Sequence, residues 1–435
     1  MNNYVAEYKR KLTTPQKAVE EIHNGETIVH GSSVAEPPAL LTAIADRARA
    51  GELLNIKIYA SLPGQYAANT VLAPDLADCI NSYSWFVTQA DRARVKVGLT
   101  YYVPNYIHQI PRLLRDFMSI DIAVTTVSPM DRSGFFTFGV ANDYISEAAR
   151  KAKRLIVEVN NNMPRVFGDT LVHISEVHAI VENHVPLLET PMPNPRPEDE
   201  IIGEKIAELV PDGATIELGI GGIPNALAHY LEDHKDLGLH SGVFVPAMMK
   251  LIEKGTINGR LKTLHPRKHI FMVALGNREM YDFINDNPSL ESYPASYVED
   301  PDIIAKNDNM ISINTIIEAD LTGQCNAEFL DGAQFSGTGG QVDFVRGAFN
   351  SRGGKSILAF YSTAKGGTTS RIVPRFEPGT IVTTSRVDTH YLATEYGVVN
   401  LKGKSTRERA LDIINLAHPK FRDELLKAAE QMYLV

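Results

Sequence analysis

The sequence ATIELGIGGIPNALAHYLE, residues 214–232, indicates the architecture of the chain most directly. Its first five residues predict a strand, GIGGIP predicts a glycine-rich loop, and residues 225–232 predict a helix with Pro224 in its first turn. A further helix is predicted upstream over residues 201–210 and is ended by residues 211–213. Alternating helices and strands imply an α/β fold with mainly parallel sheets, in which ligands bind at the carboxyl ends of the strands.

The same pattern occurs twice in the chain. Residues 17–31, KAVEEIHNGETIVHG, align without gaps against residues 205–219, KIAELVPDGATIELG, with six of fifteen positions identical. Residues 122–134, IAVTTVSPMDRSG, align in the same way against residues 311–323, ISINTIIEADLTG. Two matches in the same order and at nearly the same offset predict a duplicated domain, because the period far exceeds that of solenoid repeats.

A proline-rich stretch separates the two copies. Residues 186–197, PLLETPMPNPRP, hold five prolines in twelve positions, which is typical of a stiff, extended linker. We therefore expect an N-terminal domain over residues 1–185, a linker over residues 186–197 and a C-terminal domain over residues 198–435.

Composition and charge limit the classes of function. The chain has 435 residues, 44% of them hydrophobic, and a net charge of −9, which argues against a nucleic-acid surface. The sequence has neither an 18-residue apolar run nor an apolar signal region, so we expect no membrane association. Cys79 and Cys325 are too few for a disulfide framework and indicate a reducing, cytoplasmic compartment. The histidine and cysteine spacings of metal sites are also absent from the sequence, so we expect no bound metal.

Two glycine-rich runs are candidate ligand loops. The loop at residues 219–224 follows a predicted strand and opens a helix, a context that suits phosphate or thioester binding. Pro224 stands where a dinucleotide fingerprint has its last glycine, which argues against a dehydrogenase. Residues 335–348, FSGTGGQVDFVRGA, hold glycines whose N–H groups can form an oxyanion hole. A packing turn is the alternative interpretation of each run.

Charged residues near these loops are the candidate reactive groups. Glu217 lies on the predicted strand just before the 219–224 loop, and is either buried with a raised pKa or exposed at the sheet edge. Glu36 occupies the matching region of the first half, where it either orients a substrate or caps a helix. Lys365 either reaches a phosphate as a point charge or is simply solvated. Ser241 lacks a GxSxG elbow, which argues against a nucleophilic serine.

Four long strings in the second half carry a resemblance to a known family. They are DPDIIAKNDNMISINTIIEADLTGQ (300–324), FSGTGGQVDFVRGA (335–348), GGKSILAFYSTAKGGTTSRIVP (353–374) and TEYGVVNLKGKSTRERA (394–410). With them the chain resembles the acetyl-CoA hydrolase/transferase family, specifically its butyrate and 4-hydroxybutyrate CoA-transferase-like members, over nearly its whole length. The resemblance implies two tandem CoA-transferase-like α/β domains with the active site between them, in a cytoplasmic homodimer.

The resemblance also implies a ping-pong reaction with acyl-CoA and a carboxylate as substrates and without a tightly bound cofactor. In this chemistry a glutamate attacks the thioester, and a glutamyl-CoA thioester then forms on the enzyme. The resemblance implies that residues 219–223 lie at the CoA site and that Lys365 lies near the CoA moiety. It also implies that three further residues lie around the thioester. The individual residues are Gly219, Ile220, Gly221, Gly222 and Ile223 for CoA, and Gly339, Gly340 and Asn314 for the thioester.

The sequence departs from the family pattern at the nucleophile. A glutamate is expected two residues after His240, but this chain has Gly242, and it has Glu217 where the family has glutamine. Four interpretations stay open. Glu217 or Glu36 replaces the nucleophile, the acceptor carboxylate attacks the thioester directly, water attacks it in a hydrolase, or the chain binds CoA without catalysis. The glycine loops argue against the last of these, because a silent binder needs no oxyanion pocket.

We therefore expect an acyl-CoA:carboxylate CoA-transferase. The acids implied are butyrate, acetate, 4-hydroxybutyrate or a C4–C5 dicarboxylate such as itaconate or succinate. A thioester hydrolase is the alternative activity, and a CoA-binding protein without transferase activity is the alternative outside catalysis.

Overall fold

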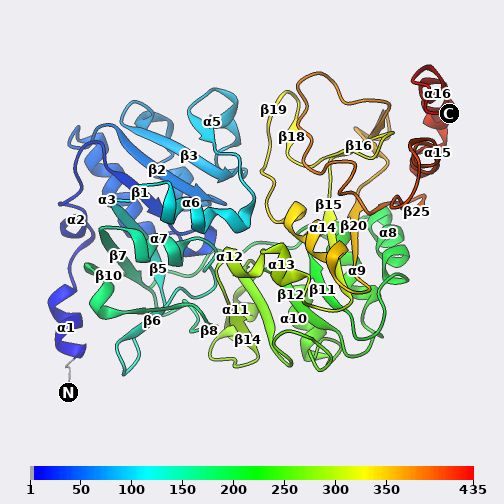
Figure 1. Cartoon of the computed structure of the whole chain (residues 1–435). Coiled ribbons are helices and arrows are strands. Elements are labelled where there is room, and N and C mark those ends of the chain that lie inside the picture. Colours follow the sequence, from blue (N-terminus) through cyan, green and yellow to red (C-terminus); the bar gives the residue numbers. More distant parts are fainter. Residues whose placement is uncertain (1–3) are drawn as a thin grey trace. The chain divides into compact units, whose positions relative to one another are not determined.

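Figure 1 shows the computed structural model of the chain, which describes residues 4–435. Contacts within the chain divide it into two compact units. Unit 1 consists of Met1–Thr190, Ile270–Val298 and Gln334–Gly337, and unit 2 of Pro191–His269, Glu299–Ala333 and Thr338–Val435. The domain limits expected at residues 185 and 198 stay predictions.

Unit 1 is built around a parallel sheet with the strand order β10-β7-β5-β1-β2-β3-β4. Each neighbouring pair in this order runs parallel, which confirms the predicted sheet type. The strands are β1 (Thr27–His30), β2 (Ile56–Ser61), β3 (Ile80–Phe86), β4 (Thr100–Tyr102), β5 (Ile122–Val127), β7 (Arg154–Val159) and β10 (Ala179–Glu182).

Helices cover both faces of this sheet, because its strands are apolar on both faces. One buried cluster joins the sheet to α2 (Pro15–Ala18), α3 (Pro38–Arg49) and α4 (Gln65–Asn69), and alternate strand residues such as Ile28 and Ile58 belong to it. The next residue along β1, Val29, is also fully buried. Helix α7 (Ile145–Lys151) contacts β1, β5 and β7, and α6 (Ile110–Asp116) packs against α7.

Unit 2 repeats the arrangement with the strand order β25-β24-β20-β15-β11-β12. The pairs are parallel except for the hairpin of β24 with β25, which is antiparallel. The strands are β11 (Thr215–Leu218), β12 (Gly238–Phe244), β15 (Met310–Thr315), β20 (Lys355–Ala359), β24 (Tyr391–Thr394) and β25 (Gly397–Asn400). Strand β11 therefore has β15 on one side and β12 on the other.

The helices of unit 2 differ from the sequence prediction mainly at their ends. Helix α8 spans Pro197–Ala207 instead of 201–210, and α9 spans Gly222–Tyr230 instead of 225–232. Helix α9 starts earlier because Gly221, with φ of 139°, turns the chain directly into it, and Pro224 is tolerated in a first turn whose N–H groups are free anyway. The other helices include α10 (Pro246–Glu253), α13 (Pro301–Ile304), α14 (Gln341–Asn350), α15 (Thr406–Leu416) and α16 (Pro419–Gln431).

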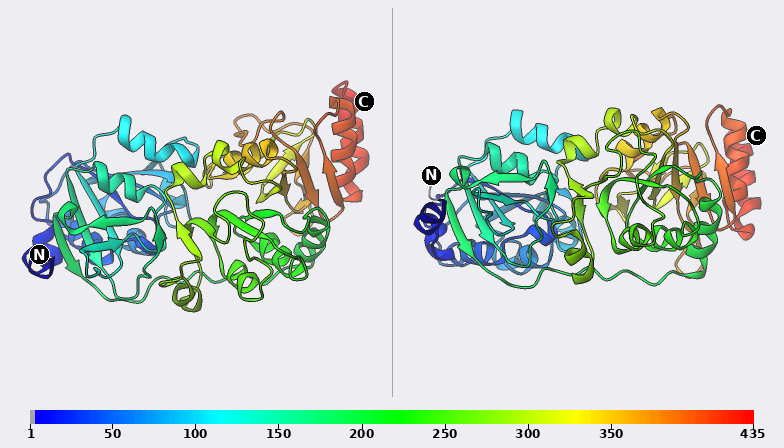
Figure 2. Two further views of the ribbon diagram at one scale, coloured as in Figure 1. Left: turned by 60° about the horizontal axis from the view of Figure 1, so that its bottom comes forward. Right: turned by 90° about the horizontal axis from the view of Figure 1, so that it is seen from below.

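The C-terminal pair of helices, α15 and α16, lies side by side in both views of Figure 2, and α15 contacts β25. The capping box expected from the sequence begins α15: Ser405 Oγ accepts from the N–H of Glu408 at 3.3 Å, and the Glu408 carboxylate accepts from the N–H of Ser405 at 2.7 Å. Between residues 4 and 435, none of the helices is long and apolar enough to cross a membrane.

The duplication seen in the sequence is present in the strand register. Ile28 of β1 pairs with Ile122 of β5, and the matching residues of the second copy, Ile216 of β11 and Ile311 of β15, pair in the same way. The tight turns that follow also match. Asp131 accepts from the backbone N–H groups two and four residues later at 2.8 and 2.9 Å, and its counterpart in unit 2 does so at 2.9 and 3.0 Å. The two units are therefore copies of one fold.

Candidate active site

Glu217 lies on β11, between β15 and β12, and is only 4% exposed. Its Oε2 accepts hydrogen bonds from Ser312 Oγ at 2.8 Å and from Asn314 Nδ2 at 2.9 Å. These two donors are alternate residues of β15, and Ser312 is the register partner of Glu217. Residues two apart on a strand share a face, so β15 presents both donors to the carboxylate of β11.

Burial raises the pKa of Glu217 to about 8, although the hydrogen bonds from Ser312, Asn314 and the Ile313 backbone oppose that shift. An isolated buried carboxyl would remain neutral, whereas these donors stabilise the anion. The carboxyl therefore changes its charge just above neutral pH, where its anion is accessible for chemistry.

The glycine loop after β11 begins beside Asn314, which is one of the donors to this carboxylate. The N–H of Gly219 donates to the carbonyl of Ile313 at 3.0 Å, and a Cβ on Gly219 would lie 3.7 Å from Asn314 Oδ1. At the far end of the loop, Ile223 is buried in the first turn of α9 and Ile220 is exposed. The structure thus brings Glu217, Asn314 and the predicted CoA loop together.

A second glycine loop belongs to the same unit at the start of α14. Gly339 has φ of 57°, and Gly340 is the residue that caps the helix. A Cβ on Gly340 would lie 2.7 Å from Cδ of Glu299 and would overlap Oε2 of that residue, so the Glu299 carboxyl packs against the glycine backbone. Both glycines are half-buried.

Glu299 was not predicted as a site residue. It is 1% exposed, and burial raises the pKa of its carboxyl well above the usual range, with further contributions from Asp343 and Glu217. The carboxyl groups of Asp343 and Glu217 therefore both act on that of Glu299. The sequence offered one weak signal, the acidic pair Glu299 and Asp300 before a helix. Asp300 caps α13 by accepting from the N–H of Asp302, and acidic residues at such a position usually serve as helix caps.

Gly242, which occupies the family's nucleophile position, lies on β12 next to β11. The register pairs Thr215 with Gly238, and its continuation along the strands places Gly242 on the same face of the sheet as Glu217. Ser241, its neighbour in sequence, donates its hydroxyl to the Val243 carbonyl at 2.9 Å. Glu217 therefore provides a carboxylate on the face of the sheet where Gly242 has no side chain.

Lys365 lies elsewhere in unit 2, at the turn between β21 (Thr363–Ala364) and β22 (Thr369–Ser370). It lines a cavity of about 580 Å³ together with Arg196 and Arg371. Tyr361 also lines the cavity, and its hydroxyl donates to Asp199 Oδ1 at 2.7 Å. A Cβ on Gly222 would lie 2.8 Å from the carboxyl carbon of Asp199, so this aspartate connects the cationic cavity to the glycine loop.

Glu36 belongs to unit 1 and holds a turn together. It is 1% exposed, and its two carboxylate oxygens accept from the N–H of Gly64 at 2.6 Å and from the N–H of Ala67 at 3.1 Å. Burial raises the pKa of Glu36 to about 7, against the effect of these backbone hydrogen bonds. The contacts are those of a side chain that fixes the start of α4, which is a different helix from the one that follows Glu36 in sequence.

We expect Glu36→Gln to destabilise the protein by about 1–3 kcal/mol at pH 8, because the amide NH₂ would face a backbone N–H that the carboxylate now accepts. Transfer of CoA should change by less than about threefold. Thermal unfolding followed by circular dichroism checks the first result and steady-state kinetics the second, with the exposed Glu20→Gln as the matched control. A large loss of transfer activity at unchanged stability would instead make Glu36 a catalytic group.

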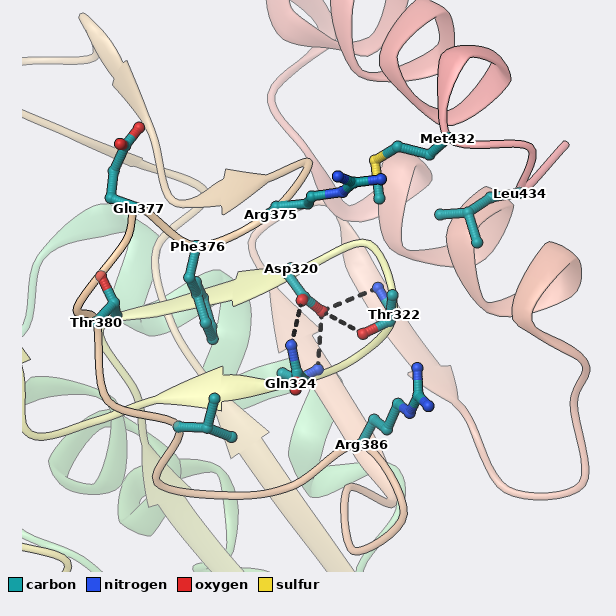
Figure 3. Close-up of a pocket in the computed structure, with 11 residues that line it drawn as sticks. Asp320, Thr322, Gln324, Arg375, Phe376, Glu377, Thr380, Arg386, Met432 and Leu434 are labelled. Carbon is teal, nitrogen blue, oxygen red and sulfur yellow. Dashed lines mark hydrogen bonds between the residues drawn. The ribbon is translucent and has the colours of Figure 1, made fainter.

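A second cavity, of about 470 Å³, lies near the C-terminus and is shown in Figure 3. The Asp320 carboxylate at its wall accepts from the backbone and hydroxyl of Thr322 and from the backbone and amide of Gln324, at 2.7–3.0 Å. Because these bonds form the duplicated tight turn, the carboxylate is already satisfied by the fold. We therefore place no part of the candidate site in this cavity.

Known proteins resemble this chain over nearly its whole length. The sequence model of the acetyl-CoA hydrolase/transferase N-terminal domain matches residues 1–189, and that of the C-terminal domain matches residues 276–429. The chain is 43% identical to a succinyl-CoA:cyclohexane-1-carboxylate CoA transferase of Geobacter metallireducens, over 99% of this chain and 97% of that protein. It is 42% identical to a 4-hydroxybutyrate coenzyme A transferase of Clostridium kluyveri, over 98% and 99% of the two chains. The crystal structure of RipA from Yersinia pestis matches with a TM-score of 0.97 and 49% identity over 100% of both chains.

Proposed function

Because the chain belongs to the acetyl-CoA hydrolase/transferase family, we propose that it is an enzyme that transfers CoA between short carboxylic acids. The observation that carries the proposal is Glu217, a buried carboxylate held by two side-chain donors on the strand that leads into a glycine loop. Similar proteins are named for succinate, cyclohexane-1-carboxylate and 4-hydroxybutyrate. Butyrate, acetate and itaconate complete the set of acids to test.

We propose Glu217 as the attacking group. Its carboxylate oxygen adds to the thioester carbonyl carbon, the carbon–sulfur bond breaks, and CoA leaves as a thiolate from a mixed anhydride. The thiolate then attacks the Glu217 carbonyl and releases the first acid, and an acceptor carboxylate reverses both steps. The donors Ser312 and Asn314 support this role because they orient the carboxylate and stabilise its anion. The Asn314 amide already donates a hydrogen bond to Glu217. It donates to a substrate oxyanion only when it divides its two N–H groups between the two oxygens or gives up the hydrogen bond to Glu217.

The backbone N–H groups of the loop at Gly339 and Gly340 are proposed to stabilise the oxyanion of each tetrahedral intermediate. Fixed donors of this kind cost no reorganisation during the reaction, and one such donor is typically worth about 3–4 kcal/mol in the transition state. The left-handed conformation of Gly339 supports the assignment, because it breaks the regular chain direction just before α14.

We propose that the cationic cavity around Lys365 receives the phosphate groups of CoA. Arg196 and Arg371 add two further positive charges to its wall, and guanidinium groups suit phosphate oxygens. Residues 219–223 would then contact the pantetheine arm between the cavity and Glu217. The link through Asp199 to Gly222 supports this path within the unit.

Lys365→Ala is expected to raise the KM for acyl-CoA by about 3- to 10-fold, because an exposed ammonium contributes roughly 1 kcal/mol to a phosphate contact. The kcat should change by less than twofold, since the residue is remote from the thioester. Initial-rate kinetics over a range of acyl-CoA concentrations measure both values. The exposed Lys427→Ala, which removes the same charge from α16, should leave both unchanged. An equal effect of the two variants would mean that Lys365 acts only through net charge.

The proposed activity is tested by incubating the protein with butyryl-CoA and measuring acetyl-CoA and free CoA with and without acetate. A transferase forms acetyl-CoA only when acetate is present and releases little free CoA. Release of CoA at the same rate without an acceptor would make the chain a thioester hydrolase. Binding of CoA without either product would leave a CoA-binding protein.

We also propose that the protein works in the cytoplasm as a homodimer. The two cysteines, Cys79 and Cys325, are both free, which is consistent with a reducing compartment. Size-exclusion chromatography with light scattering tests the assembly.

A further inference from the structure

Glu299 carries a buried polar atom that the fold does not satisfy. Within residues 4–435, its Oε2 has no hydrogen-bond partner, although the side chain is only 1% exposed. Leaving a polar group buried and unpaired costs about 1–3 kcal/mol, and more if the group is charged. A position that keeps such a group therefore requires an explanation outside the resting structure.

The direction in which Glu299 points supplies that explanation. Its carboxyl lies against the backbone of Gly340, with Cδ and both oxygens within 3.0 Å of where a Cβ would be. This is the loop that, under the proposed function, receives the thioester oxygen. A larger residue at position 340 would separate the carboxyl from the loop, whereas glycine leaves the two in contact.

The electrostatic surroundings decide the charge of this carboxyl. The groups that act on it are Asp343 of α14 and Glu217 of β11, and His240 of β12 lies on the strand next to Glu217. Burial and the two neighbouring carboxyls all raise the pKa of Glu299 and favour its neutral form, whereas two side-chain donors stabilise the anion of Glu217. Two interacting carboxyls whose surroundings separate their pKa values divide their roles, one acting as anion and the other as neutral acid. A neutral carboxyl has an O–H to donate.

We propose that Glu299 is a further catalytic residue, whose neutral carboxyl donates a hydrogen bond to the thioester oxygen bound at Gly339 and Gly340. The inference rests on the proposed function. When Glu217 attacks the carbonyl carbon, the electron pair of the C=O bond moves to oxygen, and the Glu299 O–H bond donates to that oxyanion without giving up its proton. The carbonyl re-forms as the thiolate leaves. The orphaned Oε2 thus finds its partner in the substrate complex.

Two substitutions at Glu299 separate hydrogen bonding from other roles. Glu299→Gln keeps an N–H donor of the same shape, so kcat should fall by less than about tenfold. Glu299→Leu removes the donor, and kcat should fall by about 10²–10³-fold, while the KM for acyl-CoA changes by less than about threefold. The control is Glu158→Gln on β7 of unit 1, which changes a buried carboxyl outside this cluster and should lower kcat by less than about fivefold.

The pH profile gives a readout that a purely structural residue would not change. Wild-type activity should rise as Glu217 ionises around pH 8 and fall at higher pH as Glu299 ionises, since an acid loses its proton above its pKa. Glu299→Gln should keep the rise and lose the fall. This comparison decides the proposal even when Glu299→Leu does not fold.

Three results would overturn the assignment in an active wild-type enzyme. Full activity of a folded Glu299→Leu would show that the donor is unnecessary, and an unchanged alkaline limb in Glu299→Gln would show that Glu299 is not the group that ionises there. A CoA adduct trapped on residue 299 would make it the nucleophile. Absence of acceptor-dependent transfer by the wild type would instead contradict the proposed function itself.

Discussion

Glu217→Gln is expected to lower the kcat of CoA transfer by about 10³-fold or more, because an amide cannot attack a thioester or carry CoA as a glutamyl thioester. The substitution keeps the size of the side chain, and Ser312 and Asn314 remain to bond its carbonyl oxygen. CoA should therefore still bind with a Kd within about threefold of the wild type. Stopped assays with butyryl-CoA and acetate measure the first value, and isothermal titration with CoA the second.

The covalent intermediate gives an independent check of the same residue. Incubation of the wild type with acyl-CoA and borohydride should reduce a glutamyl-CoA thioester to the alcohol, which peptide mass spectrometry should locate at residue 217. The control is Ser312→Ala, which removes one of the donors and should slow turnover by about 10- to 100-fold while leaving the label in place, since a hydrogen bond to a charged group contributes about 1.5–3 kcal/mol. A label on another carboxylate, or an active Glu217→Gln enzyme, would exclude Glu217 as the nucleophile.

Local sequence patterns were sufficient for the fold. The strand, glycine loop and helix around residues 214–232 follow from hydrophobic periodicity and turn chemistry, and these depend on neighbouring residues only. The duplication was equally visible, because both copies keep the same register of Ile28 with Ile122 and of Ile216 with Ile311. The helix ends were less accurate, since Gly221 and Pro224 start α9 three residues earlier than their sequence pattern indicated.

The candidate site was predictable only in part. Glu217 was a candidate because a carboxylate in an apolar strand beside a glycine loop is unusual, and in the structure it is buried with a raised pKa. Glu299 gave no comparable signal, because its importance depends on tertiary contact with Gly340, far along the chain. The sequence also left the role of Glu36 open, and only the contacts with the N–H groups of Gly64 and Ala67 indicate a structural role.

Gly340→Ala is expected to lower kcat by about 10²–10³-fold, the range found when an oxyanion donor is lost. The backbone of Gly340, with φ of −87° and ψ of −1°, suits alanine, so conformational strain is not the cause. The cause is the Glu299 carboxyl, which the new methyl group would overlap and push away from the loop. Overpacking of this kind also lowers stability by about 1–3 kcal/mol, which thermal unfolding measures.

A comparison at the other glycine loop and a double substitution isolate that cause. Gly219→Ala adds the same methyl group at ordinary contact distances, 3.4 Å from the Ile313 carbonyl oxygen and 3.7 Å from Asn314 Oδ1, so it should fold with nearly wild-type stability. In a Glu299→Ala background the overlap at position 340 disappears, and Gly340→Ala should then cost less than about 0.5 kcal/mol of stability. The double-mutant cycle measures the coupling of the two positions directly. An equal loss of stability in both backgrounds would show that Glu299 does not pack on Gly340. That result would remove the geometric basis for a carboxyl donor at this loop.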